Sequence, residues 1–233
     1  ALSSAASDVY KRQKNMSSTF KKALGVCNSF GSQVKSIVAG IGVTKALSVA
    51  MNTVTTSLDG AITRFDTLHS YPKVMNSLGF STDAAKASVS KLNASVQGLP
   101  TSLADIVKSA QSLTSVTGNM SKATDTAIAL NHALLASSAS TEDVSRAQQQ
   151  YSQMLAVGKP DMQSWRTLQE TMAPALTKTA KKLGIVSGNT TELYNAMKSG
   201  QITFDQFNAA LIECDTEAGG FAETALSLSL IHI

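Results

Sequence analysis

Histidine and cysteine side chains, the usual zinc ligands, are few in this chain and form no ligand motif. His69 and His132 belong to no Cys/His pattern of the kind that holds zinc. Cys27 and Cys214 lie far apart in the sequence and neither is part of a CxxC pair, which also argues against a disulfide scaffold. We therefore expect no metal site, and we expect both histidines to be structural residues at the surface or partly buried.

One segment resembles a calcium-binding loop but lacks its ligands. Between residues 195 and 206, Gly200 and Ile202 occupy the positions of the glycine and the aliphatic residue of an EF-hand. The ligand positions hold Asn195, Met197, Ser199 and Gln206. Because none of these is a carboxylate, the segment is not expected to bind calcium.

Patterns for covalent or acid–base catalysis are also missing. No serine lies in a GxSxG motif, and no Ser/His/Asp set indicates an activated nucleophile. The acidic residues Glu142, Asp143 and Glu170 have no partner in an arrangement typical of general acid–base chemistry, and acids in a first helical turn more often stabilise the helix dipole. The sequence therefore predicts no enzyme and no cofactor.

A short basic run of Lys178, Lys181 and Lys182 is the best candidate for contact with a phosphate or a membrane surface. Three lysines without interleaved aromatic residues are a weak basis for nucleic-acid binding, so a solvated helix face is the favoured interpretation. The net charge of the whole chain is only +4. We expect no specific nucleic-acid partner.

The composition favours a folded helical protein. The 233 residues are 43% hydrophobic and 15% charged, with only 5% aromatic residues, so the core must be built mainly from Leu, Val, Met and Ala. The longest apolar stretch, Ile37 to Val43, is far shorter than the roughly 20 residues of a membrane span. No part of the chain alternates with the period of two that strands require. We predict an all-α fold.

Long helices are expected over residues 14–80. Residues 17–38 form a weakly helical stretch, and from Lys45 to His69 apolar residues alternate steps of four and three over three heptads. Pro72 is expected to end this second helix at the step from Tyr71 to Pro72. Flanking charges are sparse, so packing within its own bundle is favoured over an interchain coiled coil.

Shorter helices follow, and we predict that residues 81–219 form a compact bundle. Ser81, Ser102 and Ser140 each precede an apolar helical pattern, and Asp105 and Asp143 follow the last two serines at the spacing of a capping box. These start signals place the helix boundaries.

A sequence pattern that occurs twice indicates two related helix-turn-helix units. Gly158 and Gly200 each make a turn, which is followed by an N-cap residue, Asp161 or Thr203, and then by an aromatic residue four positions into the helix. The aromatic residues are Trp165 and Phe207. Such a repeat is a packing unit and implies no chemistry.

The two ends differ from the rest of the chain. Residues 1–13 and 226–233 share no periodicity with what lies between, and SDVYKRQ and LSLIHI resemble translated sequencing-adapter sequence. We expect both segments to be non-native and the chain to be a fragment of a longer protein.

Seven short motifs, in order, resemble the N-terminal tape measure domain of long-tailed bacteriophages and of prophages in Gram-positive bacteria. The motifs are Arg64-Phe65-Asp66, Tyr71-Pro72-Lys73-Val74-Met75, Leu78-Gly79-Phe80, Gly98-Leu99-Pro100-Thr101-Ser102-Leu103, Gln150-Tyr151-Ser152-Gln153-Met154-Leu155, Gly158-Lys159 and Ser164-Trp165-Arg166-Thr167-Leu168-Gln169-Glu170. The resemblance covers roughly residues 46–219. It supplies no catalytic residues and implies packing roles: Phe65, Met75, Phe80, Tyr151 and Trp165 as anchors, and Gly79, Gly98 and Gly158 as turns.

The resemblance implies a structural protein whose length sets that of the tail tube and which leaves the tail at genome ejection. The partners it implies are the tail tube protein, tail assembly chaperones and tail-tip or initiator proteins. Association of several copies of the chain into a homo-oligomer is a further alternative. The implied location is the lumen of the virion tail, and the host cytoplasm during assembly. Membrane contact is expected only through parts of the parent chain not present here. A membrane-active or secreted helical effector is the alternative.

Overall fold

The computed structural model describes the backbone of residues 44–231, the exposure of Gly60 and the side chains of residues 62–229. The described chain consists of nine helices and contains no strand, which confirms the all-α prediction. The chain divides into two units, residues 1–62 and 63–233, and the first described helix, α2 (Thr44–Ser77), belongs to both.

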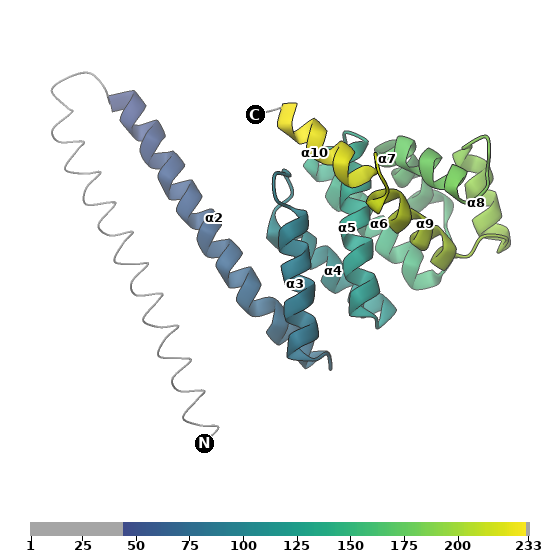
Figure 1. Cartoon of the computed structure of the whole chain (residues 1–233), viewed down its shortest axis with the longest axis horizontal. Coiled ribbons are helices and arrows are strands. Elements are labelled where there is room, and N and C mark those ends of the chain that lie inside the picture. Colours follow the sequence, from purple (N-terminus) through teal and green to yellow (C-terminus); the bar gives the residue numbers. More distant parts are fainter. Residues whose placement is uncertain (1–43, 232–233) are drawn as a thin grey trace. The chain divides into compact units, whose positions relative to one another are not determined.

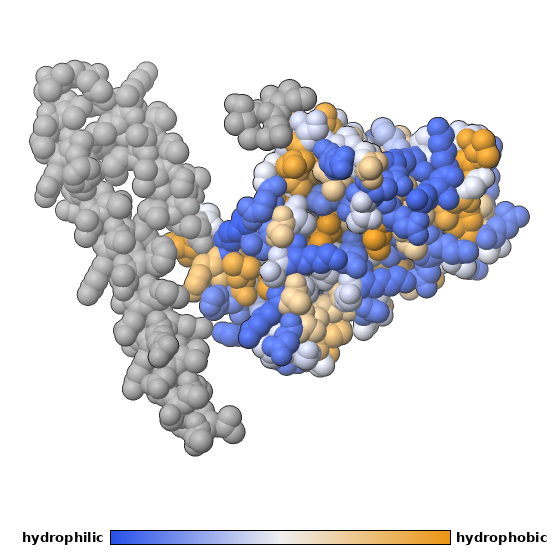
Figure 2. All heavy atoms as spheres, in the orientation of Figure 1, coloured by the Kyte–Doolittle hydropathy of each residue, from blue (hydrophilic) through white to orange (hydrophobic). Residues whose placement is uncertain are grey.

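The other helices belong to the second unit. They are α3 (Thr82–Ser95), α4 (Leu103–Thr117), α5 (Met120–Ala136), α6 (Thr141–Val157), α7 (Met162–Lys182), α8 (Thr190–Ser199), α9 (Phe204–Thr216) and α10 (Phe221–Ile231). Figure 1 shows them as a bundle with α5 in its middle. Polar residues cover most of the bundle face seen in Figure 2, with apolar residues in separate patches.

Several sequence expectations fall on the ends of the chain. Residues 1–13 and the weak helical stretch 17–38 lie outside the described residues. The heptad segment is helical from Thr44 onward, but its side chains before Gly60 are also outside the description. Residues 226–231 continue helix α10, while their non-native origin stays a prediction.

The prediction that Pro72 ends the heptad-bearing helix is wrong, because α2 continues through Pro72 to Ser77. A proline in a helix interior costs about 3 kcal/mol, mainly through one lost hydrogen bond and a local clash. Tyr71 and Met75, on either side of it, are fully buried, and each such burial is worth about 1.5–3 kcal/mol. The Tyr71 hydroxyl also lies 2.8 Å from that of Ser88. Packing of this last part of α2 against the bundle outweighs the cost of the proline.

Glycine rather than proline ends α2. Gly79 has a φ of +92°, and the N–H of Phe80 donates to the carbonyl of Met75 at 3.0 Å while that of Gly79 donates to the carbonyl of Asn76. This pair of bonds is a Schellman motif, which satisfies carbonyls left open at a helix end.

The expected helix starts are confirmed. Ser81, Ser102 and Ser140 are the N-caps of α3, α4 and α6, and each hydroxyl accepts from the backbone N–H three residues later. Asp105 and Asp143 accept from the hydroxyls of Ser102 and Ser140 at 2.6 and 2.7 Å. In these two capping boxes the carboxylate therefore bonds to the side chain of the cap residue and not to its backbone N–H. The box at Thr203 has both of its usual bonds.

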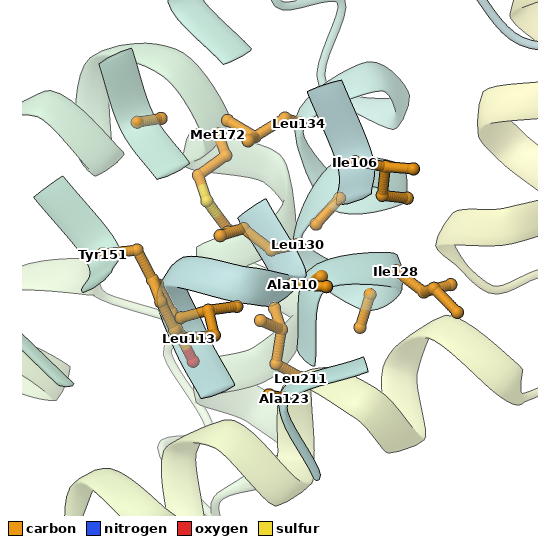
Figure 3. Packing of buried hydrophobic residues seen from close by; sticks show 14 of the residues in the cluster. Ile106, Ala110, Leu113, Ala123, Ile128, Leu130, Leu134, Tyr151, Met172 and Leu211 are labelled. Atoms are coloured by element: carbon orange, nitrogen blue, oxygen red, sulfur yellow. The ribbon is translucent and has the colours of Figure 1, made fainter. Parts of the chain in front are cut away.

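Helix α5 forms the centre of the bundle. It contacts α3, α4, α6, α7, α9 and α10, and all residues from Thr126 to Leu135 are buried. Figure 3 shows its residues Leu130 and Leu134 among side chains of neighbouring helices, including Ile106 and Met172. Alanines occupy four of its buried positions, Ala123, Ala127, Ala129 and Ala133. Because these side chains are short, neighbouring helices can approach α5 closely on several sides.

We predict that Ala127→Leu lowers the free energy of unfolding by roughly 1–3 kcal/mol, because a larger side chain has no space in a closely packed core. Urea unfolding followed by circular dichroism measures the change. Ala209→Leu is the matched control, since Ala209 lies exposed in the middle of α9 and the same substitution should change stability by less than about 0.5 kcal/mol. Equal effects of the two substitutions would contradict the close packing of α5.

Candidate functional site

The aromatic residues of the second half of the bundle meet in one buried cluster. Trp165 of α7 lies with its ring centre 5.9 Å from those of both Tyr194 of α8 and Phe207 of α9. Tyr151 of α6 lies 5.3 Å from Phe204 and 6.3 Å from Phe207. All five side chains are buried. The cluster therefore joins four helices through tilted and edge-to-face ring contacts, the arrangement that aromatic pairs prefer.

Two equivalent turns bring the rings of this cluster together, which confirms the repeat seen in the sequence. Gly158 and Gly200 end α6 and α8 with φ values of +73° and +83°. Asp161 then accepts from the N–H of Ser164 at 2.9 Å, and Thr203 caps α9 in the same way. Because glycine and cap are separated by the same number of residues in both turns, Trp165 and Phe207 lie at equivalent positions, four residues after their caps.

The repeat predicted Trp165 and Phe207, and the resemblance predicted Tyr151, but the sequence reasoning missed Tyr194 and Phe204. Tyr194 follows Leu193 and precedes Met197 on one apolar face of a short helix. Phe204 is the first residue after the cap Thr203. Both residues lie within the first turns of a capped helix, at positions where its apolar face begins. Their position after the cap was the signal in the sequence that could have predicted their burial.

A chain of polar side chains runs along the edge of the aromatic cluster. The hydroxyl of Tyr151 donates to Oδ1 of Asn208 at 2.6 Å, and Nδ2 of Asn208 donates to the hydroxyl of Thr126 at 2.8 Å. Burial raises the pKa of the Tyr151 phenol, so the group stays a protonated donor. These bonds tie α5, α6 and α9 together and give the side chains of Tyr151, Asn208 and Thr126 hydrogen-bond partners.

The remaining motif residues lie away from the cluster. Met75 is buried in the core, Phe80 is half-buried against it, and Asp66 and Pro100 are exposed. Phe65 does not act as a packing anchor, since its side chain is 38% exposed. It stacks on the ring of His69 at 4.2 Å, one helical turn further along the exposed face of α2.

The two remaining glycines of the motifs adopt left-handed backbone conformations. Gly79 makes the turn after α2, and Gly98, with a φ of +76°, lies in the turn between α3 and α4. A Cβ atom at Gly98 would lie 3.0 Å from Leu226 of α10, so this glycine also permits a close approach.

His132 is a buried residue with a charged partner that no sequence spacing indicated. Its Nδ1 lies 2.9 Å from a carboxylate oxygen of Asp215, which is 83 positions away, and its Nε2 lies 3.1 Å from the carbonyl oxygen of Ser95. Both neighbours accept hydrogen bonds, so only the doubly protonated ring satisfies both. The pair links α3, α5 and α9.

The pKa of His132 is raised above its ordinary value of 6.5. Burial by itself lowers this pKa, but the hydrogen bond and charge of Asp215 and the carbonyl of Ser95 outweigh that effect. Stabilisation by the charged pair is therefore complete below the ordinary pKa and is lost as the pH rises through the raised one.

The basic run on α7 is largely paired. Lys178 and Lys182 lie 3.0 and 3.1 Å from carboxylate oxygens of Glu217, and Lys182 also lies 3.5 Å from Glu213. The paired carboxylates favour the interpretation of this run as a surface helix face over a phosphate contact. Within the described chain, no group of three or more His, Cys, Asp or Glu side chains is placed to hold a metal ion.

These features define an all-helical protein whose distinctive residues pack helices together. A family model described as "Tape measure protein" matches residues 59–230, most of the chain. The chain therefore belongs to the tape measure protein family, a family of structural bacteriophage tail proteins and not of enzymes. The searches of curated proteins and of solved structures gave no match.

We predict that Tyr151→Phe lowers the free energy of unfolding by about 1–3 kcal/mol, because Oδ1 of Asn208 would stay buried without its donor. Chemical denaturation measures the loss. The control is Tyr194→Phe in the same cluster: its hydroxyl makes no hydrogen bond in the described part of the chain, so the change should be below about 0.5 kcal/mol. If Tyr151→Phe left the free energy of unfolding unchanged, the chain of polar side chains would contribute nothing to stability.

We predict that the stability of the protein falls as the pH rises above 6.5, the ordinary pKa of histidine, because His132 then loses its proton, and that His132→Gln removes most of this dependence. Midpoints of thermal unfolding across this range measure it. His69→Gln removes an exposed histidine and should leave the pH profile unchanged. The charged pair would be contradicted if the stability of the wild-type protein did not fall over this range, or if it fell equally in His132→Gln.

Proposed function

We propose that this chain is part of a tape measure protein that sets the length of a phage tail tube and leaves the tail at genome ejection. Membership in the family supports the proposal. The helical fold suits a ruler, because a helix rises about 1.5 Å for every residue. Helix α2, with 34 residues, alone measures roughly 50 Å on this scale.

The bundle of residues 63–231 has a different role in this proposal. Six of its helices surround α5, and α6, α7, α8 and α9 share the buried aromatic cluster, so the unit cannot extend as a single ruler helix without exposing Trp165 and Phe207. A folded unit of this kind contributes little length for each residue. We assign it to assembly: it engages tail assembly chaperones or tail-tip initiator proteins while other parts of the parent chain extend along the tube.

The proposal places the protein in the tail lumen, in contact with the tail tube protein, after assembly in the host cytoplasm. A homo-oligomer is compatible with it. The family match favours this role over a membrane-active or secreted effector. None of the described helices combines the length and the apolar character that crossing a membrane requires.

The test is an in-frame deletion of residues 63–231 in a phage that encodes this chain, with tails counted and measured by electron microscopy. We expect few tails to form, because initiation is lost. The control removes an equally long helical segment of the parent protein outside this unit, and it should give normal numbers of tails that are shorter by roughly 250 Å.

Normal numbers of tails after the first deletion, shortened as in the control, would show that the bundle is only part of the ruler. Unchanged tail length after both deletions would contradict the length-setting role itself.

A further inference from the structure

Helices α4 and α6 pack together along one side and leave an open groove of about 550 Å³ between them. Small hydroxyl residues on both helices create it, since they leave space where larger side chains would meet. Ser112 and Ser152 contact each other across the groove, with their hydroxyl oxygens 3.1 Å apart. None of the residues that line the groove belongs to the aromatic cluster or to the His132 pair.

Two polar groups in this groove lack partners. Ser109 is 9% exposed and lines the groove, yet its hydroxyl makes no hydrogen bond within the described part of the chain. Gln148 also lines the groove, and its Nε2 is buried without an acceptor. A buried polar group without a partner costs about 1–3 kcal/mol. The buried Gln148 amide therefore favours a ligand that brings a hydrogen-bond acceptor into the groove, and the Ser109 hydroxyl, whose oxygen is not fully buried, offers a second contact.

The lining residues indicate the chemistry of that ligand. Ser145, Gln148, Gln149, Ser152 and Gln153 lie along α6 in the groove wall, so hydroxyls and carboxamides recur at every helical turn. These groups both donate and accept, as a polypeptide backbone does. The charged lining residues are Asp105 and Lys108, one of each sign, which does not favour a phosphate or another anion.

The shape of the groove fits an extended chain. Its wall on α6 runs from Thr141 to Gln153, which corresponds to roughly 18 Å of helix. An extended peptide covers this length with about five or six residues. None of the lining residues is aromatic, so the groove offers no stacking face for sugar rings.

We propose that this groove binds an extended peptide segment of small, uncharged residues from a partner protein. The backbone of the segment lies along α6 and forms hydrogen bonds with Gln148, Ser109 and their neighbours. Small side chains are required because the two helices are close. This inference stands on the groove alone and does not depend on how tail length is set.

The test selects ligands from a random seven-residue peptide library on the whole 233-residue chain, and then adds an enriched synthetic peptide to isotope-labelled protein. We expect enriched peptides rich in Ser, Thr, Ala and Gly. We also expect NMR shifts of the side-chain amides of Gln148 and Gln153. Ser112→Leu, which fills the groove from an exposed position, should weaken binding at least about tenfold, the effect of 1.4 kcal/mol.

Ser115→Leu is the matched control, because Ser115 lies on the same helix, is also exposed and does not line the groove. It should bind the peptides as the wild-type protein does, and thermal unfolding verifies that both variants fold. The proposal is overturned if no peptide is enriched, or if the enriched peptides bind Ser112→Leu unchanged. It is also overturned if chitotriose shifts the two glutamine amides and the peptides do not, since the groove would then be a saccharide site.

Discussion

Helix α5 has to be covered on every side, and the rest of the bundle is arranged around that requirement. An uninterrupted run of its residues is buried, so it cannot lie at a surface without exposing a large apolar area. Its alanines allow six other helices to contact it. Helices α3, α4, α6, α7, α9 and α10 come from both sides of α5 in the sequence, and this shared contact holds them in one compact unit.

The aromatic cluster gives the same bundle a second anchor. Most of the core consists of Leu, Ala and Met, which fill space without fixing a particular orientation. Trp165, Phe207 and Tyr151 have defined ring geometries, and Tyr151 also holds Asn208 by a hydrogen bond. A protein that acts through shape needs such fixed positions more than it needs reactive groups, and this agrees with the structural role of its family.

Local features could be read from the sequence because neighbouring residues determine them. The caps Ser81, Ser102 and Ser140 act through the backbone three residues later, and the turns at Gly158 and Gly200 depend on a left-handed conformation that glycine adopts without strain. The period of the apolar residues predicted helices throughout, and the repeat of glycine, cap and aromatic residue predicted two packing units. Each of these signals lies within a few residues, so tertiary contacts were not needed to recognise it.

The tertiary structure decided everything that depends on distant partners. Pro72 stays inside α2 because Tyr71 and Met75 are buried against the bundle, a gain that local propensity does not include. Phe65 is exposed although it is aromatic, because it faces away from that contact. His132 meets Asp215 only after α5 and α9 pack, and the groove exists only where α4 and α6 lie together. The sequence by itself determined the helices and their ends through short-range hydrogen bonds, whereas long-range burial decided which side chains meet.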